Sequence, residues 1–101
     1  MSLTDAQRAS QSALEDIRRE FLADLPRRMR AIDDAAAGWE RTGSRVELQR
    51  VVHTLAGAAD IFGVDGVAAS SRRLEDLLRG GAQSEAIKAA LGELRESIKS
   101  P

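Results

Sequence analysis

The chain of 101 residues contains no cysteine, and it has one histidine, one tryptophan and two phenylalanines. Without cysteine there is no disulfide, no thiol nucleophile and no thiolate metal site, and a single histidine cannot build a multi-histidine zinc site. Because aromatic residues make up only 3% of the chain, the core must be aliphatic. The sequence thus excludes disulfide scaffolds and most metalloenzymes, and it predicts no metal site.

Long apolar runs and an excess of one charge are also missing. No run approaches the roughly eighteen apolar residues that span a bilayer, and the N-terminus lacks a signal-peptide pattern. The net charge is -1 with acids and bases interspersed, so there is no basic stripe to neutralise phosphates. We therefore expect a cytoplasmic protein that binds neither nucleic acid nor membrane.

What the sequence does contain favours helix. Alanine, leucine, arginine and glutamate are abundant, while β-branched and aromatic residues are few. The length fits one small domain that buries a single core and is too short for two. We expect one all-α domain over residues 1–101.

The first helix is predicted to be long and kinked. Thr4-Asp-Ala-Gln7 has the form of a capping box, so a helix should begin near Asp5. Pro26 should kink this helix because it removes a backbone donor and clashes with the preceding turn. Gly38 should close it, with a loop from 38 to 43. Its apolar residues recur every three or four positions: Leu14, Ile17, Phe21, Leu25, Met29 and Ile32.

Three shorter helices should follow. Ser44, as part of a second capping box, Asp65 and Ser84 are the expected N-caps, and glycines 63, 80 and 81 the expected stops. The apolar faces are Leu48, Val52, Leu55, Ala59 and Phe62, then Val67, Ser71, Leu74 and Leu78, then Ile87, Leu91, Leu94 and Ile98. Since the loops are short, successive helices should run antiparallel. The predicted fold is an up-and-down antiparallel four-helix bundle with a long kinked N-terminal helix.

The single histidine, His53, lies on the second predicted helix, about 100° around the axis from the apolar position Val52. Its surface neighbours on a helix are Gln49, Arg50, Ala56 and Gly57, with Asp60 one turn further on. Gly57 costs about 0.5–1 kcal/mol of helix stability relative to alanine. Either close helix packing or a partner that approaches His53 would account for it. An isolated histidine is more often a solvated or packing residue, so this surface alone does not assign a function.

The stretch His53-Thr-Leu-Ala-Gly-Ala-Ala-Asp-Ile-Phe-Gly63 resembles the signature of histidine-containing phosphotransfer (HPt) domains, which are four-helix relay modules of two-component signalling. The family motif is His-x-Leu-Lys-Gly, small residues, then Gly. Weaker similarity covers Phe21-Leu-Ala-Asp-Leu-Pro-Arg-Arg28, and Leu74-Glu75 with Arg79. The similarity thus extends over most of the chain.

The resemblance implies that His53 is a phosphoacceptor. It would take a phosphoryl group from a response-regulator aspartate and pass it on, with a receiver domain or a hybrid sensor histidine kinase as partner. The chain would be a phosphocarrier without autokinase activity and without an intrinsic cofactor, and Mg²⁺ would come from the receiver. An imidazole can attack through Nε2 while an acceptor holds the Nδ1 proton. Glu75 is the candidate acceptor, and a solvated acid is the alternative reading.

One position departs from the family. The family lysine three residues after the histidine is Ala56 here, so a positive charge for the phosphoryl oxygens is missing. Arg79 or Arg50 are candidate replacements, with Gln49 in support, and a solvated role is equally open for each arginine. Ala56, Gly57 and Asp60 form the predicted docking surface. Two alternatives remain: a degenerate module that docks a receiver or kinase without chemistry, and a purely structural bundle.

Overall fold

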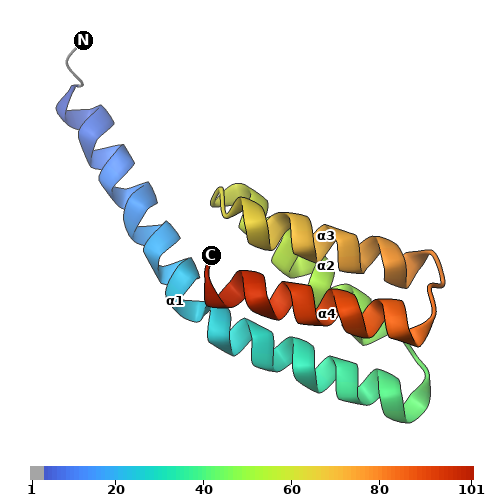
Figure 1. Ribbon diagram of the computed structural model, residues 1–101. Coiled ribbons are helices and arrows are strands. Elements are labelled where there is room, and N and C mark those ends of the chain that lie inside the picture. The colour runs from blue at the N-terminus through green and yellow to red at the C-terminus, as the bar shows by residue number, and fades with distance from the viewer. Residues whose placement is uncertain (1–3) are drawn as a thin grey trace.

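A computed structural model describes residues 4–101, and Met1-Ser2-Leu3 lies outside the described residues. Four helices follow one another: α1 (Asp5–Thr42), α2 (Val46–Ile61), α3 (Asp65–Arg79) and α4 (Ser84–Lys99). Short connections make them run up and down in one bundle (Figure 1). The described part of the chain contains no strand. The predicted all-α four-helix bundle is confirmed.

The long first helix begins where the sequence predicted. The Thr4 hydroxyl accepts a hydrogen bond from the Gln7 backbone N–H at 3.1 Å, and the Gln7 side chain accepts one from the Thr4 N–H at 2.8 Å. These two bonds satisfy backbone donors that a helix start leaves free. Pro26 lies inside α1, and the ribbon changes direction between its blue and teal segments (Figure 1).

The predicted end of this helix was wrong. α1 continues through Gly38 to Thr42, and Gly43 stops it with a left-handed φ of 78°. The reason is that Trp39 continues the apolar stripe by one more turn and is buried in the core. Burying a tryptophan outweighs the roughly 1 kcal/mol that a glycine costs inside a helix.

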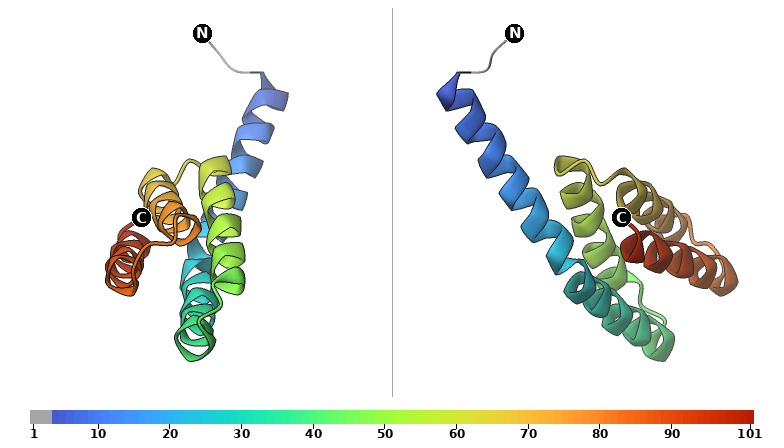
Figure 2. Two further views of the ribbon diagram at one scale, coloured as in Figure 1. Left: turned by 90° about the vertical axis from the view of Figure 1, so that its right-hand side faces the viewer. Right: turned by 60° about the vertical axis from the view of Figure 1, so that its left-hand side comes forward.

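The first part of α1 extends beyond the bundle. Residues 5–20 are all exposed, and no other helix covers them in either view of Figure 2. Leu14 and Ile17 continue the buried stripe of α1 in this part, yet they are 63% and 45% exposed. The two residues share one face of α1 with Phe21 and Leu25, as the sequence pattern predicted, but that face is not buried here. The C-terminal end of α2 reaches only the last turn of this part, where Arg18 donates to the Phe62 carbonyl at 2.9 Å.

None of the other three predicted N-caps forms a cap hydrogen bond. The N-cap residues are Arg45, Val64 and Gln83, each without a capping side chain. Asp65 and Ser84 are instead the first residues of their helices. Ser44 precedes the N-cap of α2, and its backbone N–H donates to the Thr42 hydroxyl at 3.1 Å. An Asp in the first turn still has a favourable interaction with the helix dipole.

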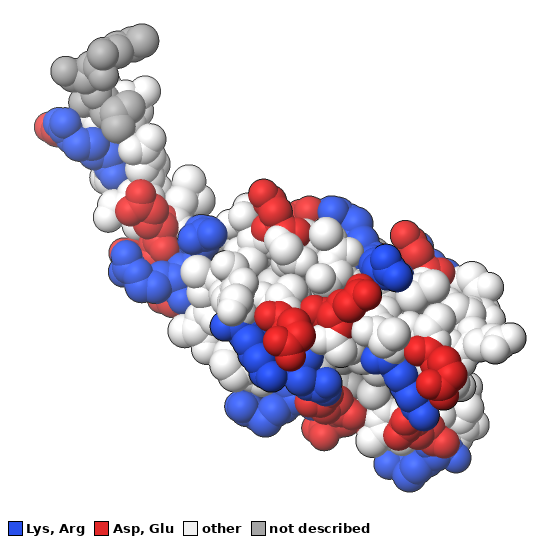
Figure 3. All heavy atoms as spheres, viewed as in Figure 1, with Lys and Arg blue, Asp and Glu red and all other residues white. Residues whose placement is uncertain are grey.

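The core is aliphatic, as the composition required. All four helices contribute fully buried side chains to it, among them Leu25, Ile32, Leu48, Val52, Leu55, Leu74, Ile87 and Leu94. Acidic and basic side chains are interspersed on the face seen in Figure 3. Within residues 4–101, no helix is both long enough and apolar enough to cross a membrane.

Candidate functional site

The packing of α2 turns His53 outward. Leu48, Val52, Leu55 and Ala59 form its buried stripe, and they face the other helices. His53 follows Val52 and is therefore rotated by about 100° away from that stripe. Its side chain is 67% exposed. A residue placed in this way can meet another protein without disturbing the core.

Glu75 of α3 makes a close polar contact with the imidazole of His53. Its Oε2 lies 2.5 Å from His53 Nδ1, and its side chain is only 10% exposed. An ionised carboxylate can only accept hydrogen bonds, so we assign the proton to Nδ1, which donates to Glu75. Nε2 is then the free nitrogen of the ring. The structure thus places Glu75 where the sequence expected a partner for Nδ1.

Arg79 lies one turn beyond Glu75 on α3. Its terminal nitrogen donates to the same Glu75 Oε2 at 3.2 Å, while its guanidinium remains largely exposed. A buried carboxylate needs such partners because desolvation penalises its charge. His53, Glu75 and Arg79 therefore form one connected group, with a cation beside the imidazole.

Arg50 lies one turn before His53 on α2 but is engaged elsewhere. Its guanidinium donates two hydrogen bonds to Glu47, at 3.0 and 2.5 Å. Through these bonds Arg50 holds the pKa of Glu47 below its usual value, and Glu47 raises the pKa of Arg50 in return. Gln49 lies on the same helix, half-buried. Of the two candidate arginines, only Arg79 contacts the partner of His53.

The predicted docking surface needs one correction. Ala56 is 4% exposed, so it is not part of an open surface. Three residues after His53, it lies about 60° around the axis on the side that packs against α3. Gly57 is exposed, and a Cβ built on it would have no atom within 4 Å. Close helix packing therefore does not explain Gly57.

Asp60, the third residue of that predicted surface, is half-exposed and pairs with Arg72 of α3. The sequence analysis did not single out Arg72. A signal was available, because Arg72, Glu75 and Arg79 recur at spacings of three and four and so share one face of α3. That face lies against the His53 side of α2.

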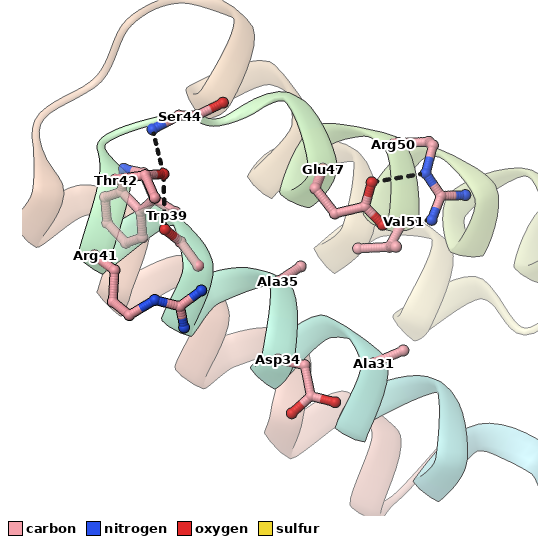
Figure 4. Close-up of a pocket in the computed structure, with 11 residues that line it drawn as sticks. Ala31, Asp34, Ala35, Trp39, Arg41, Thr42, Ser44, Glu47, Arg50 and Val51 are labelled. Atoms are coloured by element: carbon pink, nitrogen blue, oxygen red, sulfur yellow. Dashed lines mark hydrogen bonds and ion pairs between the residues drawn. The ribbon is translucent and has the colours of Figure 1, made fainter.

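One depression in the surface lies away from this group. It has a volume of about 500 Å³ and opens between α1 and the first turns of α2 (Figure 4). Ala31, Ala35 and Gly38 line it on α1, and Glu47, Arg50 and Val51 on α2. Neither His53 nor Glu75 lines it. An exposed imidazole that reacts with another protein needs no pocket of its own.

The arrangement fits a nucleophile that acts at an interface. An exposed ring with a free Nε2 can attack an electrophile presented by a second molecule, and a fixed Nδ1–H keeps the ring in the reactive tautomer. Residues 4–101 contain no group of three or more His, Asp or Glu side chains that could hold a metal ion.

Comparison with known proteins identifies one matching protein family. The family model described as Hpt domain matches residues 16–100. No curated protein and no solved structure matches the chain. Residues 5–15 of the extended part of α1 lie before the matched region.

Proposed function

The chain belongs to the Hpt domain family, and on that premise we propose that it is a phosphorelay intermediate with His53 as its phosphoacceptor. The observation that carries the proposal is an exposed imidazole whose Nδ1 is held by a buried carboxylate. The donor is the phosphorylated aspartate of a response-regulator receiver domain, and a second receiver takes the group onward. A hybrid sensor histidine kinase is an alternative source of the first receiver.

Phosphoryl transfer from the aspartate to His53 conserves atoms and electrons, and the imidazole does not lose a proton. The lone pair of His53 Nε2 forms a bond to phosphorus while the bond from phosphorus to the aspartyl oxygen breaks. The aspartate leaves as a carboxylate with that electron pair. The phosphorylated ring keeps its Nδ1 proton and carries positive charge, which Glu75 stabilises through the existing hydrogen bond. The return step is the reverse.

Arg79 supplies the cation that the family places at the position of Ala56. Its guanidinium donates to the same Glu75 oxygen that lies against His53 Nδ1, so this cation lies beside the imidazole that would carry the phosphoryl group. A positioned cation is worth a few kcal/mol in such a transition state. Mg²⁺ comes from the receiver, and the chain acts in the cytoplasm as a carrier without autokinase activity.

The test is incubation with a panel of phosphorylated receiver domains. The wild type should acquire an acid-labile phosphoryl group, and His53→Gln should acquire none. A helical circular dichroism spectrum and a cooperative melt of the variant check that it keeps the fold. Equal labelling of His53→Gln, or no labelling of the wild type by any receiver, would overturn the proposal.

A second candidate is a module that docks a receiver or kinase without phosphotransfer, and the alanine at position 56 favours it. It predicts measurable binding, no transfer, and binding that survives His53→Ala. The third candidate is a purely structural bundle. It would not account for an exposed imidazole in contact with a buried carboxylate. It predicts neither binding nor transfer.

A further inference from the structure

Two polar contacts join the exposed sides of α2 and α3. His53 meets Glu75, and Asp60 meets Arg72. Because the two helices run antiparallel, three residues forward on α2 and three residues back on α3 lead from the first contact to Ala56 and Arg72. Ala56 stands where the family has a lysine. Arg72 therefore brings a cation from α3 near the level at which α2 has none.

Arg72 and Arg79 flank Glu75 on α3. Arg72 precedes Glu75 by three residues and Arg79 follows it by four. Their Cα atoms are thus about 4.5 and 6 Å along the axis from that of Glu75, and they lie within about 20° of each other around it. Since Glu75 contacts His53 Nδ1, the imidazole lies between the levels of two arginines.

The side of α2 between His53 and Asp60 carries almost no side chain. Ala56 is buried, and a Cβ built on Gly57 would meet no atom within 4 Å. On α3, the Cβ atoms of Arg72 and Glu75 are about 5–6 Å apart, a span that an arginine side chain can cover. The guanidinium of Arg72 can therefore turn from Asp60 toward the imidazole without displacing another side chain of α2.

The two arginines differ in how firmly they are held. Arg79 donates to Glu75, a nearly buried carboxylate that needs its partners. Arg72 pairs with Asp60, and both of these side chains are about half-exposed, so their separation costs little. A phosphoryl group carries a charge of about -1.5 to -2 and binds arginine through two oxygens. A phosphoryl group on His53 would thus compete with Asp60 for Arg72, while Arg79 stays on Glu75.

We propose that Arg72 is a further phosphoryl-binding residue of this site. In the unmodified protein Arg72 pairs with Asp60, and during transfer to His53 its guanidinium moves to the phosphoryl oxygens. Asp60 then acts as a competing acceptor that keeps Arg72 away from the imidazole before transfer. This inference rests on the proposed phosphotransfer function, because it takes a phosphoryl group on His53 as the ligand. It adds no bond-making step to that transfer.

The experiment compares Arg72 with its neighbour Arg73, which pairs with Glu93 of α4 at 3.4 Å and is similarly exposed. Phosphorylation of His53 is timed with a saturating phosphorylated receiver and, separately, with phosphoramidate, a small donor that needs no docking surface. Arg72→Gln should slow both reactions about tenfold or more. Arg72→Lys should recover part of the rate because it keeps the charge, and Arg73→Gln should match the wild type.

Asp60→Asn distinguishes phosphoryl binding from a merely structural ion pair. It removes the competing acceptor, so the rate with either donor should rise about two- to fivefold. A structural pair predicts instead that Asp60→Asn and Arg72→Gln lower the rate alike. Glu93→Gln is the matched control and should leave the rate unchanged.

The outcomes separate this inference from the proposed function. A rate unaffected by Arg72→Gln, or lowered equally by Asp60→Asn or by Arg73→Gln, would overturn the inference and leave the phosphorelay role intact. An effect of Arg72→Gln with the receiver but none with phosphoramidate would assign Arg72 to docking, which also overturns it. If phosphoramidate labels His53 but no receiver does, the proposed function fails and the phosphoramidate series still tests Arg72. If neither donor labels His53, both are wrong.

Discussion

The two faces of α2 differ in burial and in their role in packing. The buried face consists of Leu48, Val52, Leu55 and Ala59, and it contributes apolar area to the core. The exposed face presents His53, Gly57 and Ile61, none of which the bundle needs for packing. One face therefore holds the fold and the other is free to act on a partner. Substitutions on the two faces should separate stability from phosphotransfer.

The largest effect on stability should come from the buried face. Leu55→Ala removes a fully buried side chain and leaves a cavity, which should lower the free energy of unfolding by about 2–5 kcal/mol. Chemical denaturation monitored by circular dichroism measures this. Transfer per folded molecule should stay near that of the wild type. A selective loss of transfer in the folded fraction would contradict the division between the faces.

Glu75 lies at the border of the two faces, and its replacement should affect chemistry more than stability. Glu75→Leu fills the same buried space but cannot accept a hydrogen bond from His53 Nδ1–H. Losing a charge-assisted hydrogen bond of about 1.5–3 kcal/mol should slow transfer roughly tenfold or more. Glu75→Gln keeps an acceptor and should recover part of the rate. Single-turnover transfer at saturating receiver measures this, and a rate unaffected by Glu75→Leu would remove Glu75 from the mechanism.

Two substitutions at Gly57 should separate helix stability from receiver binding. Since a Cβ there meets no atom within 4 Å, Gly57→Ala should stabilise the protein by about 0.5–1 kcal/mol. A larger residue, Gly57→Gln, should block the approach of the receiver and weaken binding while leaving the fold intact. Thermal melts and receiver titrations test both. Undiminished binding of Gly57→Gln would show that no partner comes close to this position.

The smallest effect should come from Arg50. Arg50→Gln removes the two bonds to Glu47, so the pKa of Glu47 should rise toward its ordinary value. Because the folded pKa of Glu47 is depressed, the pair stabilises the fold above the unfolded pKa, and this contribution is lost as the pH falls through the folded pKa. Both side chains are exposed, so the change in melting temperature should be small. Titration of Glu47 by carbon-detected NMR measures the shift, and a large loss of transfer would place Arg50 in the mechanism after all.

The sequence was sufficient for the features set by periodicity. The apolar spacings of three and four predicted the four helices and the outward direction of His53. The contact between His53 and Glu75 was expected from family resemblance, because periodicity alone does not say which residues of two helices meet.

The failures came from positions where local signals competed with packing. Gly38 is typical of a helix end, but α1 continues for four more residues because Trp39 is buried in the core. The predicted N-caps were each one residue away from the observed N-cap: Ser44, Asp65 and Ser84. Helix spacing predicted Ala56 as a surface neighbour of His53, but it is buried in the bundle, on the side of α2 that faces α3. Such outcomes depend on where the neighbouring helix lies, which no pattern within one helix contains.

The most direct test of the exposed face as a reactive surface is the position of the phosphoryl group on the ring. Transfer from a phosphorylated receiver to protein labelled with ¹⁵N at histidine, followed by ³¹P and ¹⁵N NMR, identifies the nitrogen bonded to phosphorus. We predict phosphorus on Nε2 of His53, with Nδ1 protonated and hydrogen-bonded to Glu75. Phosphorus on Nδ1, or a histidine that stays unmodified with every receiver tested, would contradict the account.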